Sequence, residues 1–288
     1  MKCMSCRSYL FVPADSERKL ASAAEAGADA LILDLEDAVV PYAKPRAREM
    51  VAEFLSSSVA PTRLVRVNSL ETGETEMDVA ASAAHNPDGY VLPKCEGPSD
   101  IAEFARIIER HNNSSQIGIM AIATETARAV RLLMREDWSH PRLFALTWGG
   151  EDLAADLGAL SNRDASGDYL DPFRMARTLT LYAAVEAGVA PVDAVFTGFR
   201  DPDGLKQEAR VACAVGFVGK MAIHPAQVPV INAAFTPTDA QAEWAQKVVN
   251  LLSTAESGVA WLDGEMLDAP HRKRAENILA RYSRRAAI

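Results

Sequence analysis

Two carboxylates, Glu125 and Asp152, stand directly after two successive apolar runs of the chain. Their oxygens are hard donors, and a site that offers two carboxylates while water and substrate fill the remaining positions suits Mg2+. No His-rich set competes for zinc. The alternative is that each carboxylate only begins a helix, where the helix dipole favours negative charge.

Arg66 ends an otherwise apolar run and is the next residue whose side chain suggests a chemical role. A guanidinium at such a position loses hydration energy unless it binds an anion, so it suits a substrate carboxylate or a developing oxyanion. The alternative is a structural ion pair with Glu36 or Asp37.

Three other features are weaker. The pair Gly149-Gly150 allows the backbone to approach a ligand, but it equally suits a tight turn. His224 before Pro225 could act as a base, although a lone histidine is more often structural. Cys3 and Cys6 have CxxC spacing without a second pair, so we expect reduced thiols in a disordered start rather than zinc ligands.

Polar residues recur where the apolar runs end. In a parallel barrel these ends converge on one face, which is where active sites of such barrels lie. Ordinary loop polarity is the competing explanation, but repetition at most runs favours a functional mouth. The residues are Asp15, Asp34, Glu36, Asp37, Arg66, Asn68, Lys94, Thr124, Glu125, Glu151, Asp152, Lys220 and His224.

The apolar runs themselves have the length and composition of strands. They are rich in Val, Ile, Leu and Phe and nearly continuous, as expected of parallel strands buried on both faces. We predict strands at 8–13, 30–36, 63–68, 89–94, 117–124, 143–148, 194–197 and 217–224.

Amphipathic helix-length stretches such as 16–26, 44–55, 98–110 and 173–187 separate these strands. About eight strand–helix units in about 225 residues predict an α/β fold, a (β/α)8 TIM barrel. A doubly wound open sheet is the competing fold. Neither of its phosphate fingerprints is present, since no early G-x-G-x-x-G occurs and Met221 follows Gly219-Lys220.

A tail follows the barrel pattern. It holds a helical stretch at 239–253, a turn around Trp261–Gly264 and a basic last helix from His271. We predict a catalytic barrel domain over residues 1–255 and a C-terminal helical lid or oligomerisation segment over 256–288. Apolar residues at 261, 262, 266 and 267 need a surface to cover, which is either a neighbouring subunit or the chain's own barrel.

Composition excludes several classes of protein. The chain has 288 residues and 39 acidic against 30 basic side chains, which gives a formal net charge of −9. Nucleic-acid binding needs clustered Lys and Arg, so it is not expected. No apolar run reaches the roughly 18 residues of a membrane span, and the first residues do not resemble a signal peptide. We therefore expect a cytoplasmic protein.

The motifs of the chain resemble those of the citrate lyase β-subunit family within the HpcH/HpaI aldolase/citrate lyase superfamily. They run in order from about Ser8 to Pro270, nearly the whole chain. The matching segments are Leu10–Ala14, Leu33–Val39, Arg66–Asn68, Leu92–Lys94, Thr124–Ala127, Gly149–Leu153, Gly219–Pro225 and Asp263–Pro270.

This resemblance implies a Mg2+-bearing barrel that assembles as a homotrimer or as a higher assembly of trimers. Matched motif to motif, Glu125 and Asp152 would bind Mg2+, with Glu125 also contacting substrate. Arg66 would hold the keto acid or its oxyanion. Phe11, Arg18, Ile223 and His224 would line the CoA moiety. Asp268 would close over a neighbouring subunit's site and serve acid/base chemistry.

The activity implied is cleavage or formation of a short 3-hydroxyacyl-CoA thioester such as malyl-, citramalyl- or citryl-CoA, with acetyl-CoA and a keto acid as products. A thioesterase on the same scaffold and a β-subunit acting within a larger complex are the alternatives. The tail motif around Asp268 favours a lyase of free CoA thioesters. Many relatives carry Ile where this chain has Thr124, before the metal-binding glutamate.

Overall fold

The computed structural model describes residues 6–57, 61–255 and 258–283 of the chain. Its first part is a closed barrel of parallel strands, in which each strand pairs with the next and β8 pairs back with β1. The strands are β1 (Ser8–Pro13), β2 (Ala30–Asp34), β3 (Thr62–Arg66), β4 (Gly89–Leu92), β5 (Gly118–Ile122), β6 (Leu143–Thr147), β7 (Ala190–Asp193) and β8 (Gly219–Ala222). The predicted (β/α)8 barrel is confirmed, and the open doubly wound sheet is wrong.

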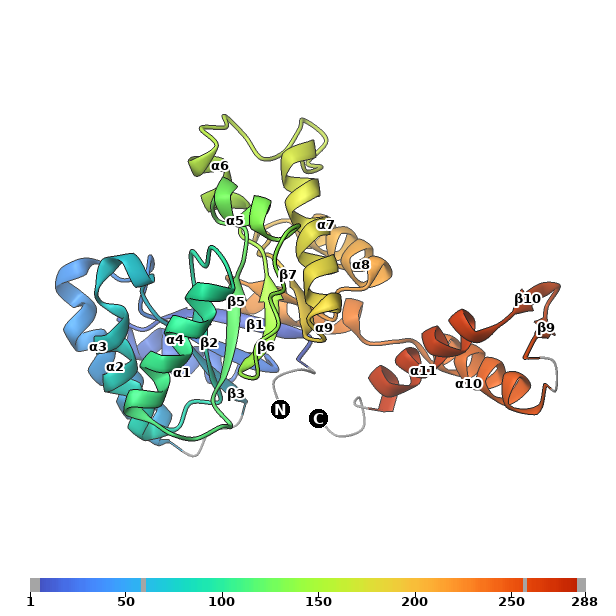
Figure 1. Ribbon diagram of the computed structural model, residues 1–288, viewed down its shortest axis with the longest axis horizontal. Helices are drawn as coiled ribbons and strands as arrows, with labels where there is room; N and C mark the ends of the chain where they lie inside the picture. The colour runs from blue at the N-terminus through green and yellow to red at the C-terminus, as the bar shows by residue number, and fades with distance from the viewer. Residues whose placement is uncertain (1–5, 58–60, 256–257, 284–288) are drawn as a thin grey trace. The chain divides into compact units, whose positions relative to one another are not determined.

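Helices lie outside the strands and connect them (Figure 1). Prolines occupy the first turn of α2, α4, α7 and α8, where the missing N–H has no helical partner. The helices are α1 (Glu17–Ala24), α2 (Lys44–Ser56), α3 (Thr75–Ser82), α4 (Pro98–His111), α5 (Ala127–Leu132), α6 (Gly150–Asp156), α7 (Asp171–Glu186), α8 (Pro202–Val215) and α9 (Val228–Phe235), with short 3-10 turns η2 (Pro41–Ala43), η3 (Leu70–Thr72), η4 (Ala83–His85) and η5 (Pro225–Gln227).

Every strand contributes an apolar side chain to one buried cluster that fills the barrel. Side chains between them on each strand are also buried, because they face the helices: the Tyr90 ring packs edge-on against Phe104 of α4, with centroids 5.8 Å apart. This double burial explains the continuous apolar runs. The cluster contains Tyr9, Ile32, Leu64, Val91, Met120, Phe144, Val192 and Met221, and it also includes Cys6.

The N-terminal prediction needs a partial correction. Cys6 is 4% exposed and packs among the barrel side chains, so the expectation that it belongs to a disordered start is wrong. Its Sγ lies 3.8 Å from the hydroxyl of Thr62 at the start of β3. Cys3 lies outside the described residues.

The seventh strand lies four residues earlier than the sequence predicts, at Ala190–Asp193 rather than at 194–197. A proline and an aspartate within four residues argue against a buried strand, because Pro lacks a donor and a lone buried charge is costly. Asp193 is nevertheless fully buried. Its compensating charges come from α7 and β8, which no local pattern reveals.

Asp193 belongs to a buried ion network between the strands and the outer helices. Its carboxylate accepts from Lys220 Nζ at 2.7 Å and from Arg177 Nε at 2.9 Å. Lys220 Nζ also lies 2.8 Å from Glu208 Oε1. Lys220 is itself fully buried, and its neighbour Met221 faces the barrel interior. Lys220 therefore contacts the helix layer and does not belong to the predicted mouth.

We predict that the free energy of unfolding decreases at acid pH because Asp193 becomes protonated. Burial alone would raise its pKa, but Lys220 and Arg177 outweigh burial and lower the pKa to about 2. Because the pKa of Asp193 is lower in the folded protein than in the unfolded chain, where it is about 4, the charged carboxylate stabilises the fold fully above pH 4. This contribution is lost as the pH falls toward 2. Asp193→Asn should cost about 3–5 kcal/mol at pH 7, because Lys220 and Arg177 each lose a buried negative partner.

That deficit should shrink by about 2 kcal/mol between pH 4 and pH 2. Urea unfolding of both proteins across this range, followed by circular dichroism, measures it. If the free energies of unfolding of the wild type and of Asp193→Asn differ by the same amount at every pH, Asp193 does not titrate between pH 4 and pH 2.

The second compact unit of the chain is Ala233–Ile288, and the first is Met1–Asn232. Helix α10 (Asp239–Thr254) packs along α11 (Ala269–Ser283), and β9 (Ala260–Leu262) pairs with β10 (Glu265–Leu267). Its core contains Ala245, Val248, Leu252, Leu267 and Ala275. The boundary between the two compact units, at 232/233, thus lies 23 residues before the predicted boundary at 255/256, and α10 belongs with the tail. The functional division into catalytic domain and lid stays a prediction.

The turn predicted near Trp261 is the hairpin turn between β9 and β10. Asp263 and Gly264 have φ values of 51° and 86°, both in the left-handed region. Two such residues form the tight turn that matches the twist of a two-stranded ribbon, and Asp-Gly is a favoured pair for it.

No helix in the described ranges combines the length and the apolar character needed to cross a membrane.

Candidate functional site

Polar side chains from five neighbouring strands gather at the carboxyl end of the barrel. Asp34 and Arg66 are the last residues of β2 and β3, Lys94 and Glu125 follow β4 and β5, and Asp152 lies in the first turn of α6 after β6. The strands are adjacent in the order β2-β3-β4-β5-β6. The structure therefore brings Arg66, Glu125 and Asp152 to the one face on which the sequence places them.

Arg66 is held by two carboxylates. Its Nε and Nη2 donate to the two oxygens of Asp34 at 2.7 and 2.6 Å, and Nη1 lies 2.8 Å from Glu36 Oε2. Burial alone would lower the pKa of Arg66, but Asp34 and Glu36 reverse this and raise it. The guanidinium also lies over the Phe11 ring, 4.8 Å from its centroid. The ion pair with Glu36 exists, while Asp34 is a partner that the sequence did not indicate.

Lys94 is the second cation of the site; the sequence placed it at the predicted mouth but assigned it no catalytic, substrate-binding or metal-binding role. Its Nζ lies 2.5 Å from Glu36 Oε1, 3.6 Å from Asp37 and 3.9 Å from Asp152. Its φ of 49° is in the left-handed region, which a lysine seldom adopts. In this conformation the backbone N–H of Lys94 donates to Glu125 Oε2. Its place at the end of a predicted apolar strand is the one feature of the sequence that could have indicated this role.

Glu125 is 4% exposed, so its charge has little access to water. Burial, and next the nearby charge of Asp152, raise the pKa of Glu125 to about 8. Gly149 approaches it so closely that a Cβ on this glycine would lie 2.7 Å from Glu125 Cγ. The glycine is thus needed for close approach to the Glu125 side chain itself.

The donor set fits a divalent cation. The two cations Arg66 and Lys94 lie among five carboxylates, those of Asp34, Glu36, Asp37, Glu125 and Asp152. In the described part of the chain, no three Asp, Glu, His or Cys side chains are grouped to hold a metal ion. Glu125 and Asp152 would supply two hard oxygens to Mg2+ and leave its other positions to water and substrate.

Comparison with known proteins identifies the family. The model of the HpcH/HpaI aldolase/citrate lyase family matches residues 7–225. The chain belongs to this family. The mitochondrial citramalyl-CoA lyase of Mus musculus is 33% identical over an alignment of 291 residues, and this alignment covers 95% of this chain and 85% of that protein. The (3S)-malyl-CoA thioesterase of Cereibacter sphaeroides is 34% identical over an alignment of 287 residues, which covers 98% of this chain and 96% of that protein.

Solved structures agree with this membership in the HpcH/HpaI family. CitE from Mycobacterium tuberculosis, in complex with magnesium, acetoacetate and coenzyme A, superposes with a TM-score of 0.83 at 34% identity. The match covers 98% of this chain and 100% of that chain.

In this HpcH/HpaI family member, the residues predicted to contact CoA lie on the β1 and β8 side of the barrel mouth. Phe11 is half-buried in β1 beneath Arg66, and Arg18 is exposed on α1. Ile223 and His224 are exposed directly after β8, which pairs with β1. Phe11 thus lies against Arg66, the other three residues follow β1 and β8, and the contact of all four with CoA stays a prediction.

His224 has a structural task of its own. Its Nδ1 accepts from the N–H of Ala226 at 3.2 Å, and it forms a reciprocal cap with Gln227 at the start of η5. The ring stacks on Phe199 with centroids 5.2 Å apart, and Arg200 lies over the same Phe199 ring. No local pattern indicates this aromatic pair, because Phe199 and His224 follow different strands.

Asp268 lies in the second compact unit, directly before α11. Its Oδ1 lies 2.6 Å from Nδ1 of His271, one helical turn later. Both side chains are more than a third exposed. The carbonyl of Asp268 accepts from the N–H of Arg272 and closes the first turn of α11. A role in a neighbouring subunit's site stays a prediction.

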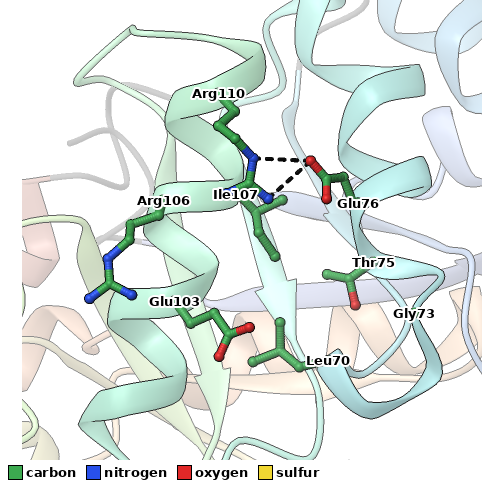
Figure 2. A pocket seen from close by; sticks show the side chains of 8 residues that line it. All are labelled: Leu70, Gly73, Thr75, Glu76, Glu103, Arg106, Ile107 and Arg110. Carbon is green, nitrogen blue, oxygen red and sulfur yellow. Dashed lines mark hydrogen bonds and ion pairs between the residues drawn. The ribbon is translucent and has the colours of Figure 1, made fainter.

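A surface pocket between η3, the start of α3 and α4 is separate from these residues (Figure 2). Glu76 and Arg110 face each other across it, with Arg110 Nε and Glu76 Oε1 3.0 Å apart, and both side chains are about half exposed. No predicted site residue lines it. The lining residues are Leu70, Gly73, Thr75, Glu76, Glu103, Arg106, Ile107 and Arg110.

We predict that Arg66→Lys is not a conservative change. Lysine keeps the charge but cannot donate to both oxygens of Asp34 and to Glu36 at once. We expect turnover to fall by about 100-fold or more and stability to fall by about 1.5–3 kcal/mol.

Steady-state kinetics and thermal unfolding measure the two effects. Arg110→Lys, in the exposed pair with Glu76, is the matched control and should change neither quantity. Wild-type turnover in Arg66→Lys, with only the loss of stability, would reduce Arg66 to a structural ion-pair partner.

Proposed function

We propose that this chain is a Mg2+-dependent carbon–carbon lyase that cleaves or forms a short 3-hydroxyacyl-CoA thioester, such as citramalyl-, malyl- or citryl-CoA. The products of cleavage are a keto acid and acetyl-CoA. The observation that carries the proposal is the pair Glu125 and Asp152 beside Arg66 and Lys94 at the barrel mouth. Related proteins support it, since one is named citramalyl-CoA lyase and a CitE structure holds magnesium, acetoacetate and coenzyme A.

The charges of the site suit this reaction. In cleavage the carbinol hydroxyl gives up its proton and becomes the keto oxygen, and the bond between the carbinol carbon and the carbon next to the thioester breaks. The electron pair of that bond moves into the acetyl-CoA enolate, which then takes up a proton at its methyl carbon. Bound by Glu125 and Asp152, Mg2+ would supply Lewis acidity to the substrate carboxylate and hydroxyl. Glu125 receives the N–H of Lys94, which keeps one carboxylate oxygen oriented before the metal arrives.

Arg66 supplies a fixed positive charge to the developing keto acid. Two of its N–H groups donate to Asp34, and Nη1 lies 2.8 Å from Glu36 Oε2 in an ion pair, so the group is held in place and still has donors for an oxyanion. One preorganised donor of this kind is typically worth about 2.7–4 kcal/mol of transition-state stabilisation. Because Arg66 is already locked, it loses little freedom when substrate binds.

Asp268 is the proposed acid/base residue for the methyl carbon of acetyl-CoA. The apolar residues Trp261 and Met266 of the hairpin are 67% and 51% exposed, so the segment carries side chains suited to cover another surface. We propose that this segment closes over the site of a neighbouring subunit in a homotrimer or in a higher assembly of trimers. Closure would exclude water and protect the enolate.

Two other functions stay open. The 34% identity to a (3S)-malyl-CoA thioesterase favours hydrolysis as the second candidate, because a metal-bound water needs only modest repositioning to attack the thioester. A β-subunit that acts within a larger complex is the third candidate. Copurification with an acyl-carrier protein would favour it.

A substrate panel tests the proposed function. Malyl-, citramalyl-, methylmalyl- and citryl-CoA, assayed with Mg2+, should yield a keto acid and acetyl-CoA from at least one thioester. Glu125→Gln should lower this turnover at least about 100-fold, since even residues that only orient metal ligands cost 10–100-fold. Glu76→Gln, in the separate surface pocket, is the matched control and should keep wild-type turnover. Release of the intact hydroxy acid and free CoA would instead establish a thioesterase.

The shared site gives a second prediction. Asp268→Asn should keep Mg2+ and CoA binding but lose most turnover, because the amide cannot exchange the proton. Mixing inactive Asp268→Asn with inactive Glu125→Gln, after subunit exchange, should restore part of the activity. Native mass spectrometry confirms that mixed oligomers form. Mixed oligomers that stay inactive would assign Asp268 to its own subunit or to helix capping alone.

A further inference from the structure

Thr124 connects the two segments that carry the proposed metal ligands. It is fully buried between the end of β5 and Glu125. Its Oγ1 accepts a hydrogen bond from the backbone N–H of Gly149, at 3.1 Å. The ladder between β5 and β6 continues just before it, since the N–H of Ala123 donates to the carbonyl of Thr147 at 2.9 Å. The Thr124 hydroxyl is thus the next link after the last backbone bond of this strand pair.

Gly149 is the residue from which α6 begins. It precedes Gly150 as the N-cap, with φ −122° and ψ 103°, and it has no side chain to cap the helix. Its carbonyl accepts from the N–H of Leu153 and closes the first turn. Asp152 lies within that turn, so the position of Gly149 sets the position of the Asp152 carboxylate.

Gly149 also packs directly against the other carboxylate. A Cβ there would lie 2.7 Å from Cγ and 3.3 Å from Oε1 of Glu125. A small displacement of the Gly149 backbone therefore moves Asp152 and changes the packing of Glu125 at the same time. The Thr124 hydroxyl thus holds the one residue, Gly149, that contacts Glu125 and begins the turn that carries Asp152.

We infer that Thr124 is a positioning residue which fixes the separation of Glu125 and Asp152 and thereby tunes Mg2+ affinity. This inference rests on the proposed function, in which these two carboxylates bind the metal. The hydroxyl is required because a polar N–H that loses its acceptor moves to find another. A side chain of equal shape without an oxygen would leave the first turn of α6 free to shift.

Two variants separate the hydroxyl from the shape of the side chain. Thr124→Val keeps the shape and removes the acceptor, whereas Thr124→Ser keeps the acceptor. Titration of metal-free protein with MgCl2 in a calorimeter should give a dissociation constant about tenfold higher for Thr124→Val, equivalent to about 1.4 kcal/mol. Thr124→Ser should stay within about threefold of wild type, consistent with a retained hydroxyl.

Hydrogen exchange supplies a readout that does not involve the metal. Peptides that contain Gly149 should exchange faster in Thr124→Val, while peptides of α8 should exchange as in the wild type. Thermal unfolding of the metal-free variants reports whether the fold is kept. If Thr124→Val does not fold, Thr124→Ala takes its place, with the same expected loss of Mg2+ affinity relative to Thr124→Ser.

The outcomes distinguish the inference from the proposed function. Wild-type protein that binds no Mg2+ would overturn the metal site and this inference with it. Wild-type binding that is unchanged in Thr124→Val would overturn the inference alone. Equal losses in the Val and Ser variants would also overturn it, because side-chain packing and not the hydroxyl would then govern affinity.

Discussion

The buried carboxylate of Glu36 joins the two cations of the candidate site, and the arrangement at the barrel mouth depends on it. One oxygen lies 2.8 Å from Arg66 and the other lies 2.5 Å from Lys94. Burial raises the pKa of Glu36 above its ordinary value, although both cations oppose this. Since a buried carboxylate is stable only with such partners, Glu36, Arg66 and Lys94 hold one another in place. The result is a preorganised pair of positive charges on neighbouring strands.

Glu125 and Asp152 lie next to this pair without a full complement of positive charge. Lys94 reaches Asp152 only at 3.9 Å, and Glu125 receives an N–H and no cation at hydrogen-bond distance. The repulsion between them contributes to the raised pKa of Glu125, so a divalent cation would relieve an existing strain. One side of the mouth thus suits a metal, and the other suits an anionic oxygen of the substrate.

A second buried ion network lies on the helix side of the barrel, and its charges pair with one another instead of facing the mouth. Asp193 and Lys220 are both fully buried, and each lies against opposite charges: Asp193 pairs with Arg177 and Lys220, and Glu208 pairs with Lys220 and Arg163. This network ties β7 and β8 to α7 and α8. Similar residue types thus act structurally in one layer and remain available for ligands in the other, because carboxylates outnumber cations at the mouth.

The sequence by itself determined the fold class, because strands buried on both faces are continuously apolar and seven of the eight could be placed by that property. It also placed Arg66, Glu125 and Asp152 on one face, because parallel strands bring their carboxyl ends together. Pairing across the barrel was decided only by the tertiary structure. Asp193 made a true strand unrecognisable, since its partners Arg177 and Lys220 lie 16 and 27 residues away. Neighbours on adjacent strands decide which ion pairs Asp34, Glu36 and Lys94 form. Such a neighbour also provides the Gly149 N–H that bonds Thr124. Local patterns report burial and periodicity, whereas a charge or a hydroxyl acquires its function from the group that faces it in space.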